Sequence, residues 1–373
     1  MKLHTGINSS ARREILKKET GVLFISITRA EVNDEKNVKI ENNIGGTSIP
    51  LGVAGPLLIR GEEIKRNCYI PLATTEGALV ASVQRGCKVI GLSGGISTNV
   101  NKVGATRGPV FYVSSLKEFK KFSAWLSVHE EELKKEAEKT SSHLQYKKMD
   151  VQGVGNYVYT RFYFDTNDAM GMNMVTIATQ AIAAFIKKKA GIECLALAGN
   201  FDVDKKPSWM NFINHRGLQV WAEIIVPALV VQKVLHTTSR KIYEVWLAKC
   251  MIGSAMSGSL GFNAHYANVV AAFFTATGQD LAHVVEGSMG ITTTNIVENE
   301  SLYFSVYLPA VMMATVGGGT KYETQKEALA LTCARNVEDL GKVLGGAVLA
   351  GELSLLASLA EGSLAQSHQR LGR

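Results

Sequence analysis

Residues 109–197 alternate between segments typical of strands and segments typical of helices. The strand-like PVFYVS is followed by a charged helical segment over 116–140, the strand-like LQYKKMDVQ and YVYTRFYFD, a helical segment over 169–189, and the strand-like IECLALA. This βαββαβ order is the signature of a ferredoxin-like unit. We therefore predict a small ferredoxin-like domain, inserted into a larger domain that residues 41–108 and 198–373 would form.

The remaining segments predict an α+β protein whose large domain is mainly helical. Residues 1–40 are typical of a basic amphipathic helix and a polar linker, and the glycines and prolines of 41–71 indicate turns between short strands. A helix is expected from about Thr75 to Val89. With 373 residues and 46% hydrophobic side chains, the chain is too long for one ordinary core, which agrees with two domains.

Composition narrows the class of protein without deciding it. The 40 Lys and Arg exceed the 33 Asp and Glu, and a net charge of +7 could attract nucleic acid, an acidic membrane or a phosphorylated cofactor. The five cysteines form no C-x-x-C pair, which argues against a zinc ribbon or a disulfide framework. The N-terminus lacks an apolar signal segment, and no uncharged apolar run is long enough to span a bilayer. We expect a cytoplasmic protein.

Common catalytic fingerprints are missing. The chain contains neither G-x-x-x-x-G-K-[ST] nor G-x-S-x-G. His129-Glu130 lacks the second histidine of H-E-x-x-H, because Leu133 occupies that position, and Tyr322 replaces a glycine that G-x-G-x-x-G would need in GGGTKY. A P-loop NTPase, a zincin and an α/β-hydrolase are therefore poor interpretations.

Five segments concentrate residues suited to chemistry, and each also has an ordinary structural explanation. Glu76, in PLATTEGALVAS, could be a first-turn residue that complements the helix dipole, or a carboxyl whose pKa is raised by close packing. In TNDAMGMNM, Asp168 could be an N-cap, whereas Gly171 and Asn173 weaken the helix start and would let a phosphate approach it.

The other three segments leave the same choice open. DVDKKP is typical of a solvated turn, or it aims a lysine at a carbonyl oxygen. His265 and Asn268 lie one turn apart and Asp280 could be an N-cap, while His368 continues the apolar face of a terminal helix. Together the five segments supply an acid, cations, a carboxylate, a histidine and helix ends that bind anions. That set suits reduction of a carbonyl with a phosphate-bearing cofactor and without a metal.

Eight segments in sequence order resemble the motifs of the HMG-CoA reductase family. They are ENNIGGTSIPLGVAGPL, PLATTEGALVASVQRGC, DAMGMNM, GNFDVDKKP, GFNAHYANVV, TGQD, TVGGGTK and GELSLLASLAEGSLAQSH, and they run from about Glu41 to His368. DAMGMNM and the C-terminal pattern resemble the class I, soluble archaeal-type branch. The resemblance implies reduction of HMG-CoA to mevalonate and CoA with two NADPH, no metal, and an active site between the subunits of a homodimer or higher oligomer.

The resemblance also implies roles for residues. Glu76 would protonate the substrate oxygen, Lys205 would stabilise the oxyanion, and Asp280 would link the two. His368 would protonate the departing CoA thiolate. Substrate contacts would fall on Arg107, Asp204, Lys206, Lys249, His265 and Asn268, and contacts to CoA on Ser82, Arg85 and Lys88. The dinucleotide would be held in the small domain, 109–197, and by the glycine segment, through Asp168, Met170, Gly171, Met172, Asn173, Met174, Gly317, Gly318 and Gly319. Residues 1–40 would contribute to dimerisation.

Two other functions compete with this one. A class II-like enzyme could oxidise mevalonate with NAD, and a protein without catalysis could simply bind CoA or another polyanion. The positive charge would serve two polyanionic ligands, so no nucleic-acid partner is expected. Ala198 stands where many class I members have a serine that touches the substrate, so one contact would be missing.

Overall fold

One antiparallel sheet runs through both predicted domains. The computed structural model describes residues 8–23, 25, 40–60 and 68–362. Its main sheet has the strand order β7-β4-β6-β3-β8-β10-β9, with β5 paired to β6. The strands are β3 (Ser97–Arg107), β4 (Val110–Tyr112), β5 (Gln145–Val154), β6 (Tyr157–Asp165), β7 (Cys194–Ala196), β8 (Arg216–Val226), β9 (Ile291–Val297) and β10 (Ser301–Val311).

The small domain has the predicted ferredoxin-like fold. Strands β7, β4, β6 and β5 are neighbours in this order, and α4 (Leu116–Val128), α5 (Glu130–Glu138) and α6 (Met172–Ala190) connect them. The single helix predicted over 116–140 is wrong, because it is broken at His129, whose ring Nδ1 contacts the Trp125 carbonyl oxygen at 2.8 Å. A separate hydrophobic core, which includes Phe111, Phe162 and Ile182, fills this domain.

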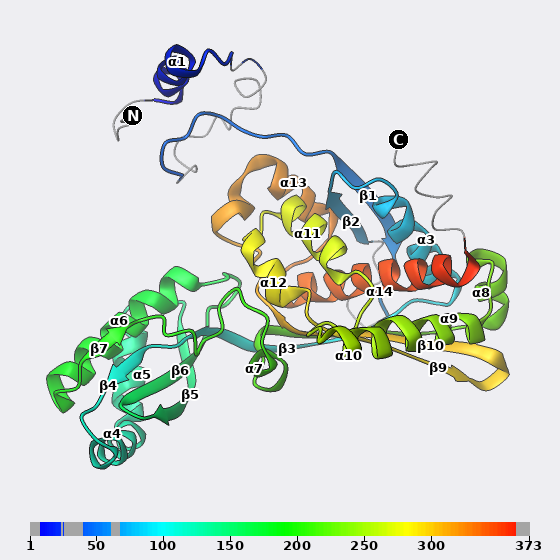
Figure 1. The fold of residues 1–373 in the computed structure, drawn as a ribbon. Helices are drawn as coiled ribbons and strands as arrows, with labels where there is room; N and C mark the ends of the chain where they lie inside the picture. Colours follow the sequence, from blue (N-terminus) through cyan, green and yellow to red (C-terminus); the bar gives the residue numbers. More distant parts are fainter. Residues whose placement is uncertain (1–7, 24, 26–39, 61–67, 363–373) are drawn as a thin grey trace.

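The long strand β3 joins the two domains. Its residues 97–104 pair with β8, and 105–107 pair with β6 (Figure 1). The large domain is mainly helical, as predicted, but the sequence interpretation did not single out β8, β9 and β10, which form an antiparallel sheet there. Every second residue along β10 is buried from Leu302 to Leu308, so alternation along this strand was present in the sequence.

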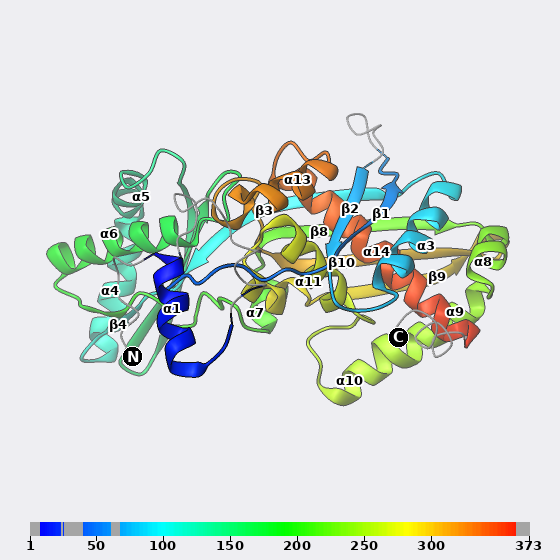
Figure 2. The same ribbon diagram turned by 90° about the horizontal axis from the view of Figure 1, so that it is seen from above.

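The sheet of the large domain packs against a buried central helix, α14 (Val337–Glu361), which Figures 1 and 2 show running beside α3 (Leu79–Leu92). Within the described residues, α14 is long and apolar enough to cross a membrane, which the sequence interpretation overlooked. However, 83% of its most apolar window is buried inside the protein, so its composition is explained by its place in the core.

The remaining elements surround this core. They are the hairpin β1 (Leu51–Leu57) and β2 (Cys68–Ala73), α7 (Trp209–Ile213), α8 (Ala228–Leu235), α9 (Ser239–Trp246), α10 (Ser254–Ser257), α11 (Tyr266–Thr277), α12 (Val284–Gly287) and α13 (Glu323–Leu331). The predicted N-terminal helix is present as α1 (Ser9–Thr20), which lies apart from both domains in Figure 1.

Candidate active site

The predicted lysine and aspartate of the active site lie against each other. Lys205 lies in the turn between β7 and α7, with a left-handed backbone (φ 57°). Its ammonium nitrogen Nζ is 2.8 Å from Asp280 Oδ2, and Asp280 Oδ1 accepts a hydrogen bond of 3.1 Å from the Ala282 N–H. Asp280 therefore caps the 3-10 helix Leu281–His283, as predicted, and holds Lys205 at the same time.

The Asp280 carboxylate is stabilised in its ionised form. Burial raises the pKa of this carboxyl, but hydrogen bonds from Lys205 and the Ala282 N–H, together with the charge of His283, outweigh it and lower the pKa overall. The side chains of Lys205 and Asp280 are 38% and 35% exposed. The ammonium is thus fixed by an anion on one side and accessible on the other, an arrangement that can stabilise negative charge on a carbonyl oxygen.

Glu76 lies outside the helix in which it was predicted. Helix α3 begins at Leu79 rather than near Thr75, because Ala78 before it has a left-handed φ of 72°. The Glu76 side chain is exposed in the single chain, so the chain by itself does not provide the close packing that was one of the two explanations for this residue. Its Oε2 accepts a hydrogen bond of 2.7 Å from Asn268 Nδ2. This bond joins the predicted acid to a predicted substrate contact rather than to Asp280.

A polar cleft opens beside the start of α11. Six of the side chains that line it are Lys249, Ser254, Ser257, Asn263, His265 and Asn268. Lys249 is exposed on the π-helix Leu247–Gly253, a rare helix type that is frequent at functional sites. Three predicted substrate contacts, at 249, 265 and 268, therefore share one cleft.

A buried carboxylate, Glu352 of α14, fixes His265 at the edge of this cleft. Glu352 accepts hydrogen bonds from the N–H groups of Ala264 (2.9 Å) and His265 (2.7 Å). Its Oε1 also lies 2.8 Å from His265 Nδ1, and its Oε2 accepts from the Thr292 hydroxyl at 2.7 Å. Since the carboxylate accepts from Nδ1–H, the other ring nitrogen, Nε2, is left for a ligand.

The other predicted substrate contacts, Arg107, Asp204 and Lys206, form a second cluster. Arg107 Nη1 is 3.3 Å from Asp202 Oδ2 and 3.9 Å from Asp204 Oδ2. Lys206 is exposed, and its Nζ lies 3.5 Å from the Asp204 carbonyl oxygen. Asp204 therefore contacts both cations, Arg107 through its carboxylate and Lys206 through its backbone carbonyl oxygen.

Two of the three predicted CoA contacts are instead engaged with α14. Ser82 donates a hydrogen bond of 3.0 Å to the Ser354 hydroxyl, and Arg85 donates one of 2.6 Å to the Ser354 carbonyl oxygen and another to the Ser358 hydroxyl. Lys88, on the same helix α3, is exposed. Ser82 and Arg85 therefore hold α3 against α14.

A second cavity, of about 350 Å³, brings the predicted dinucleotide residues together. Met170, Gly171, Met172, Asn173 and Met174 line one part of it, and Gly317, Gly318 and Gly319 line another. Asp168 is different: it is not the N-cap of α6, which follows Gly171, and its Oδ1 accepts a hydrogen bond of 2.8 Å from the Val337 N–H at the start of α14. Asp280 also lines this cavity, so the cofactor residues reach the Lys205–Asp280 pair.

The cavity depends on two glycines that touch. A Cβ on Gly278 would lie 2.4 Å from the Gly319 carbonyl oxygen, and a Cβ on Gly319 would lie 2.6 Å from that of Gly278. No larger residue fits at either position. This contact holds the glycine segment, Gly317 to Gly319, against the turn that leads into Asp280.

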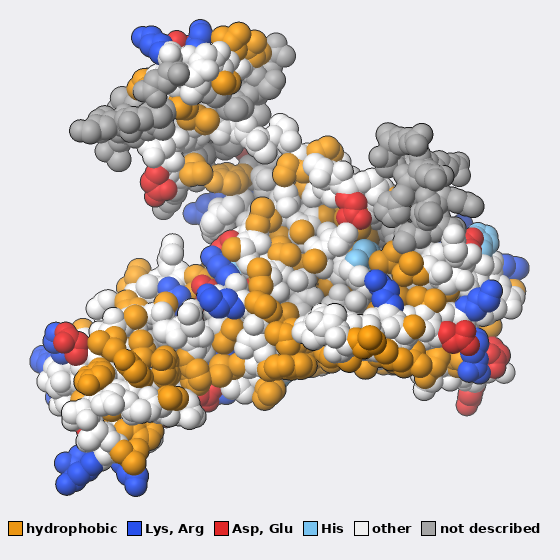
Figure 3. All heavy atoms as spheres, viewed as in Figure 1, with side chains coloured by type: hydrophobic (Ala, Val, Ile, Leu, Met, Phe, Trp, Pro, Cys, Tyr) orange, Lys and Arg blue, Asp and Glu red, His pale blue; other side chains and the backbone are white. Residues whose placement is uncertain are grey.

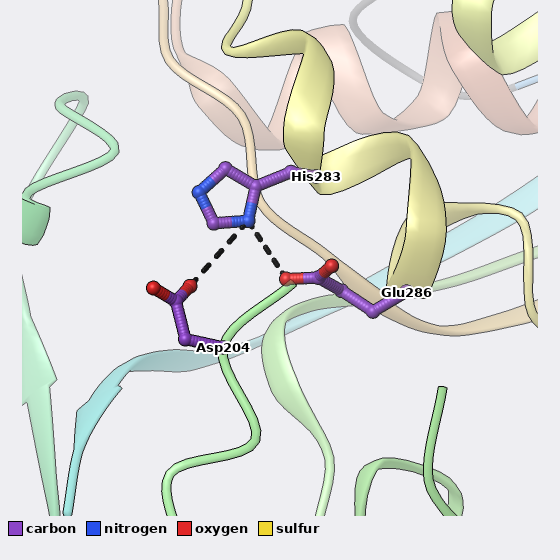
Figure 4. A group of neighbouring side chains, drawn as sticks. All are labelled: Asp204, His283 and Glu286. Atoms are coloured by element: carbon purple, nitrogen blue, oxygen red, sulfur yellow. Dashed lines mark hydrogen bonds and ion pairs between the residues drawn. The ribbon is translucent and has the colours of Figure 1, made fainter. Parts of the chain in front are cut away.

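Sequence reasoning missed a buried group of charged side chains next to Asp280. His283 Nδ1 is 2.7 Å from Glu286 Oε1 and 3.8 Å from Asp204 Oδ1 (Figure 4). The fully buried Arg216 places Nη1 2.6 Å from Glu286 Oε1 and Nη2 2.8 Å from Asp204 Oδ1. A signal was available for two of them, since His283 and Glu286 follow Asp280 at helical spacing in GQDLAHVVEGS.

The same group could be mistaken for a metal site. Ligand atoms of Asp204, His283 and Glu286 lie within 4.8 Å of one another. The two carboxylates, however, already accept hydrogen bonds from the Arg216 guanidinium, which supplies the positive charge that an ion would bring. The group is accounted for as a buried ion-pair network.

The sequence missed Glu352 as well, although a lone carboxylate in the apolar run GELSLL was the kind of signal that singled out Glu76. The predicted catalytic His368 lies outside the described residues.

Comparison with known proteins gives one consistent result. The sequence profile of the hydroxymethylglutaryl-coenzyme A reductase family matches residues 8–373. Two similar relatives are the 3-hydroxy-3-methylglutaryl-coenzyme A reductases of Methanocaldococcus jannaschii (50% identical, 98% of this chain and 93% of that protein) and Methanothermobacter thermautotrophicus (47%, with 97% and 92%). The fold is similar to that of a class II 3-hydroxy-3-methylglutaryl-CoA reductase from Streptococcus pneumoniae bound to NADPH (TM-score 0.71, 18% identity, 95% of this chain and 97% of that chain).

Proposed function

The chain belongs to the hydroxymethylglutaryl-coenzyme A reductase family, and from this premise we propose that it reduces HMG-CoA to mevalonate and CoA with two NADPH. The observation that carries the proposal is the position of the Lys205–Asp280 pair. Asp280 lines the cavity of the dinucleotide residues, and the turn of Lys205 continues into Pro207, which lines the polar cleft. A carbonyl group that reaches from the cleft into the cavity would pass Lys205.

The cavity residues suit a dinucleotide. The first N–H groups of α6, after Gly171, have no partner within the helix and favour phosphate oxygens. A Cβ placed on Gly317 or Gly318 would meet nothing within 4 Å, so a ligand can approach the backbone there. NADPH, when bound, supplies the hydride for each reduction.

The residues of the chain handle the charge and the protons. Each reduction places negative charge on the substrate oxygen, which the Lys205 ammonium stabilises while Asp280 keeps that ammonium in position. Glu76 gives its proton to this oxygen, and His368 protonates the CoA thiolate that leaves after the first reduction. The carbonyl carbon gains two hydrides, one proton ends on the CoA sulfur, and one ends on the new alcohol oxygen.

The cleft binds the acid portion of the substrate. Lys249 attracts its carboxylate, and His265, held by Glu352, offers Nε2 to its hydroxyl. Arg107, Asp204, Lys206 and Asn268 complete the contacts. Lys88 meets the CoA phosphates, whereas Ser82 and Arg85 act by fixing α14. Asp168 acts on the cofactor cavity through its bond to α14.

We further propose a cytoplasmic class I homodimer whose active site is completed by the partner subunit. Exposed apolar side chains support this: Leu51, Val53 and Tyr69 lie on the hairpin just before the exposed Glu76, and Figure 3 shows others gathered over both domains. Light scattering should give at least twice the mass of the chain. Leu51→Lys should lower both that mass and kcat, while Val128→Lys, 78% exposed on the small domain, should change neither. A fully active monomer would contradict the proposal.

The reaction itself is tested by the absorbance of NADPH. Purified protein should oxidise two NADPH for each HMG-CoA consumed, and substitution of NADH for NADPH should lower the rate strongly. A preference for NADH would favour the class II-like alternative. If the absorbance of NADPH stays constant when HMG-CoA is added, the protein lacks the proposed reductase activity.

A further inference from the structure

We propose that His283, held by Glu286, is a positioning residue that keeps Asp280 in place when the substrate oxygen draws the Lys205 ammonium away. This inference rests on the proposed function, because it gives His283 a part in each reduction. It gives the Asp280 carboxylate a second partner in addition to Lys205.

The imidazole lies on the buried side of the same carboxylate oxygen that Lys205 holds. His283 is fully buried, and its Nε2 is 3.6 Å from Asp280 Oδ2, whereas Lys205 Nζ is 2.8 Å from that oxygen. At this separation Nε2 makes no hydrogen bond, and it has no other partner among the described residues. A shift of well under 1 Å would create the bond.

Glu286 prevents the ring from turning away. Its Oε1 accepts from His283 Nδ1 (2.7 Å), from Arg216 Nη1 (2.6 Å) and from the Lys205 backbone N–H (3.3 Å). The side chains of Glu286, Arg216 and His283 are all fully buried, so neither side-chain donor can exchange Glu286 for water. The orientation of Nε2 toward Asp280 is therefore built into the fold.

Charged side chains surround the ring of His283. The charged groups that face His283 are the carboxylates of Asp204, Asp280 and Glu286 and the cations of Lys205 and Arg216. Both ring nitrogens also face carboxylates, and only an imidazolium can donate from both.

This arrangement matters during the reaction. An oxyanion on the substrate competes with Asp280 for the Lys205 ammonium, so Asp280 would lose its main partner at that moment. A half-buried carboxylate without a partner takes up a proton more readily, and would then hold Lys205 less well. A donor at Nε2 maintains the ionised form of Asp280 through both reductions.

Two variants of His283 test the inference. His283→Leu, which removes the donor and the charge, should lower kcat by about 10- to 100-fold while KM for HMG-CoA stays near that of the wild type. The acid limb of the kcat profile should move to higher pH, because the charge of His283 helps to lower the pKa of Asp280. His283→Gln keeps a hydrogen-bond donor, so its kcat should be close to that of the wild type. The acid limb of its kcat profile should shift less than that of His283→Leu. Equal kcat values and equal acid limbs in all three proteins would overturn the role.

A measurement without substrate separates this inference from the proposed function. Carboxyl-carbon NMR should show Asp280 titrating at higher pH in His283→Gln and His283→Leu than in the wild type, whether or not the chain oxidises NADPH. An unchanged Asp280 titration in His283→Gln, with circular dichroism confirming a folded protein, would refute the contact even if His283→Leu failed to fold.

Discussion

Glu76 lies in an exposed loop before α3 and accepts a hydrogen bond from Asn268. In the single chain it is therefore neither the helix-end carboxylate nor the buried acid between which the sequence left the choice open. A carboxyl that must hold a proton needs burial, which here would have to come from the partner subunit or the substrate.

Glu76→Gln should therefore leave the fold intact and abolish the reduction. Among the residues that the structure describes, the Glu76 side chain makes one hydrogen bond, which an amide oxygen can still accept, so the melting temperature should change little. Loss of a proton donor typically costs a factor of about 10²–10⁴ in kcat. The measurement is NADPH oxidation with HMG-CoA, with the exposed Glu323→Gln as control. A rate within a few-fold of the wild type would remove Glu76 from the mechanism.

His283, Glu286 and Arg216 show why side-chain networks escape sequence reasoning. Their contacts span residues 204 to 286, and a single sequence gives no distance between segments so far apart. The segments of Lys205 and Asp280 were singled out from the residues alone, but the roles of the two side chains came only from the resemblance to a family. Their pairing is a property of the folded chain.

At the scale of elements, the order of the small domain was predictable because its strands and helices are local and strongly patterned. Strands β8, β9 and β10 were missed because the glycine-rich and alanine-rich helices around them dominated the interpretation of residues 198–373. The break at His129 was missed because the charged pattern continues through it. The start of α3 was misplaced because alanine seldom adopts the left-handed conformation of Ala78.

The crossing of α3 and α14 depends on Gly86. A Cβ there would lie 2.1 Å from the Ala350 carbonyl oxygen, so Gly86→Ala must separate the two helices and should cost about 1–3 kcal/mol or more of unfolding free energy. Gly91 in the same helix meets nothing within 4 Å, and Gly91→Ala should stabilise by about 0.5–1 kcal/mol. Urea unfolding of both variants measures the difference. Equal stabilities would show that the helices do not pack this closely.

The contribution of the contact between the two domains to protein stability should depend on pH. Asp165 lies at the end of β6. Its Oδ1 is 2.7 Å from Nζ of Lys102 on β3, and its Oδ2 is 3.5 Å from Nζ of Lys147 on β5. Burial raises its pKa, but the hydrogen bonds from Lys102 and the Asn167 N–H and the two lysine charges lower it overall. Asp165→Asn should cost about 1–2 kcal/mol at pH 7. Because the folded pKa is lowered, that contribution is present above the ordinary value near 4 and is lost as pH falls through the folded value.

The exposed pair of Glu193 and Lys187 provides the matched control for this contact. The Lys187 Nζ and Glu193 Oε1 atoms are 2.6 Å apart, but the side chains are 64% and 68% exposed, so Glu193→Gln should leave the stability nearly unchanged. Thermal unfolding of both variants between pH 3 and pH 7 compares them. If the loss of stability caused by Asp165→Asn relative to the wild type stayed constant with pH, the effect would not be ionic in origin.

At the scale of the whole molecule, the Lys205–Asp280 pair links the two cavities, because Asp280 lines one of them and Pro207, two residues after Lys205, lines the other. The cavity of the dinucleotide residues is built from the start of α6 in the small domain and from the glycine segment of the large domain, and the polar cleft belongs to the large domain alone. Lys205 and Asp280 lie where the two regions meet. The resemblance predicted which segments would gather, whereas their relative placement follows from the long strand β3 and the insertion that it carries.

The most direct test of this account is the activity of Lys205→Ala toward both HMG-CoA and mevaldehyde. Each substrate develops negative charge on oxygen during hydride transfer, so loss of the ammonium should reduce NADPH oxidation by at least about 10²- to 10³-fold with either one. Lys241→Ala, an exposed lysine on α9, should be as active as the wild type. Lys205→Ala protein that remains folded and reduces either substrate at a near-normal rate would contradict the central role given to the Lys205–Asp280 pair.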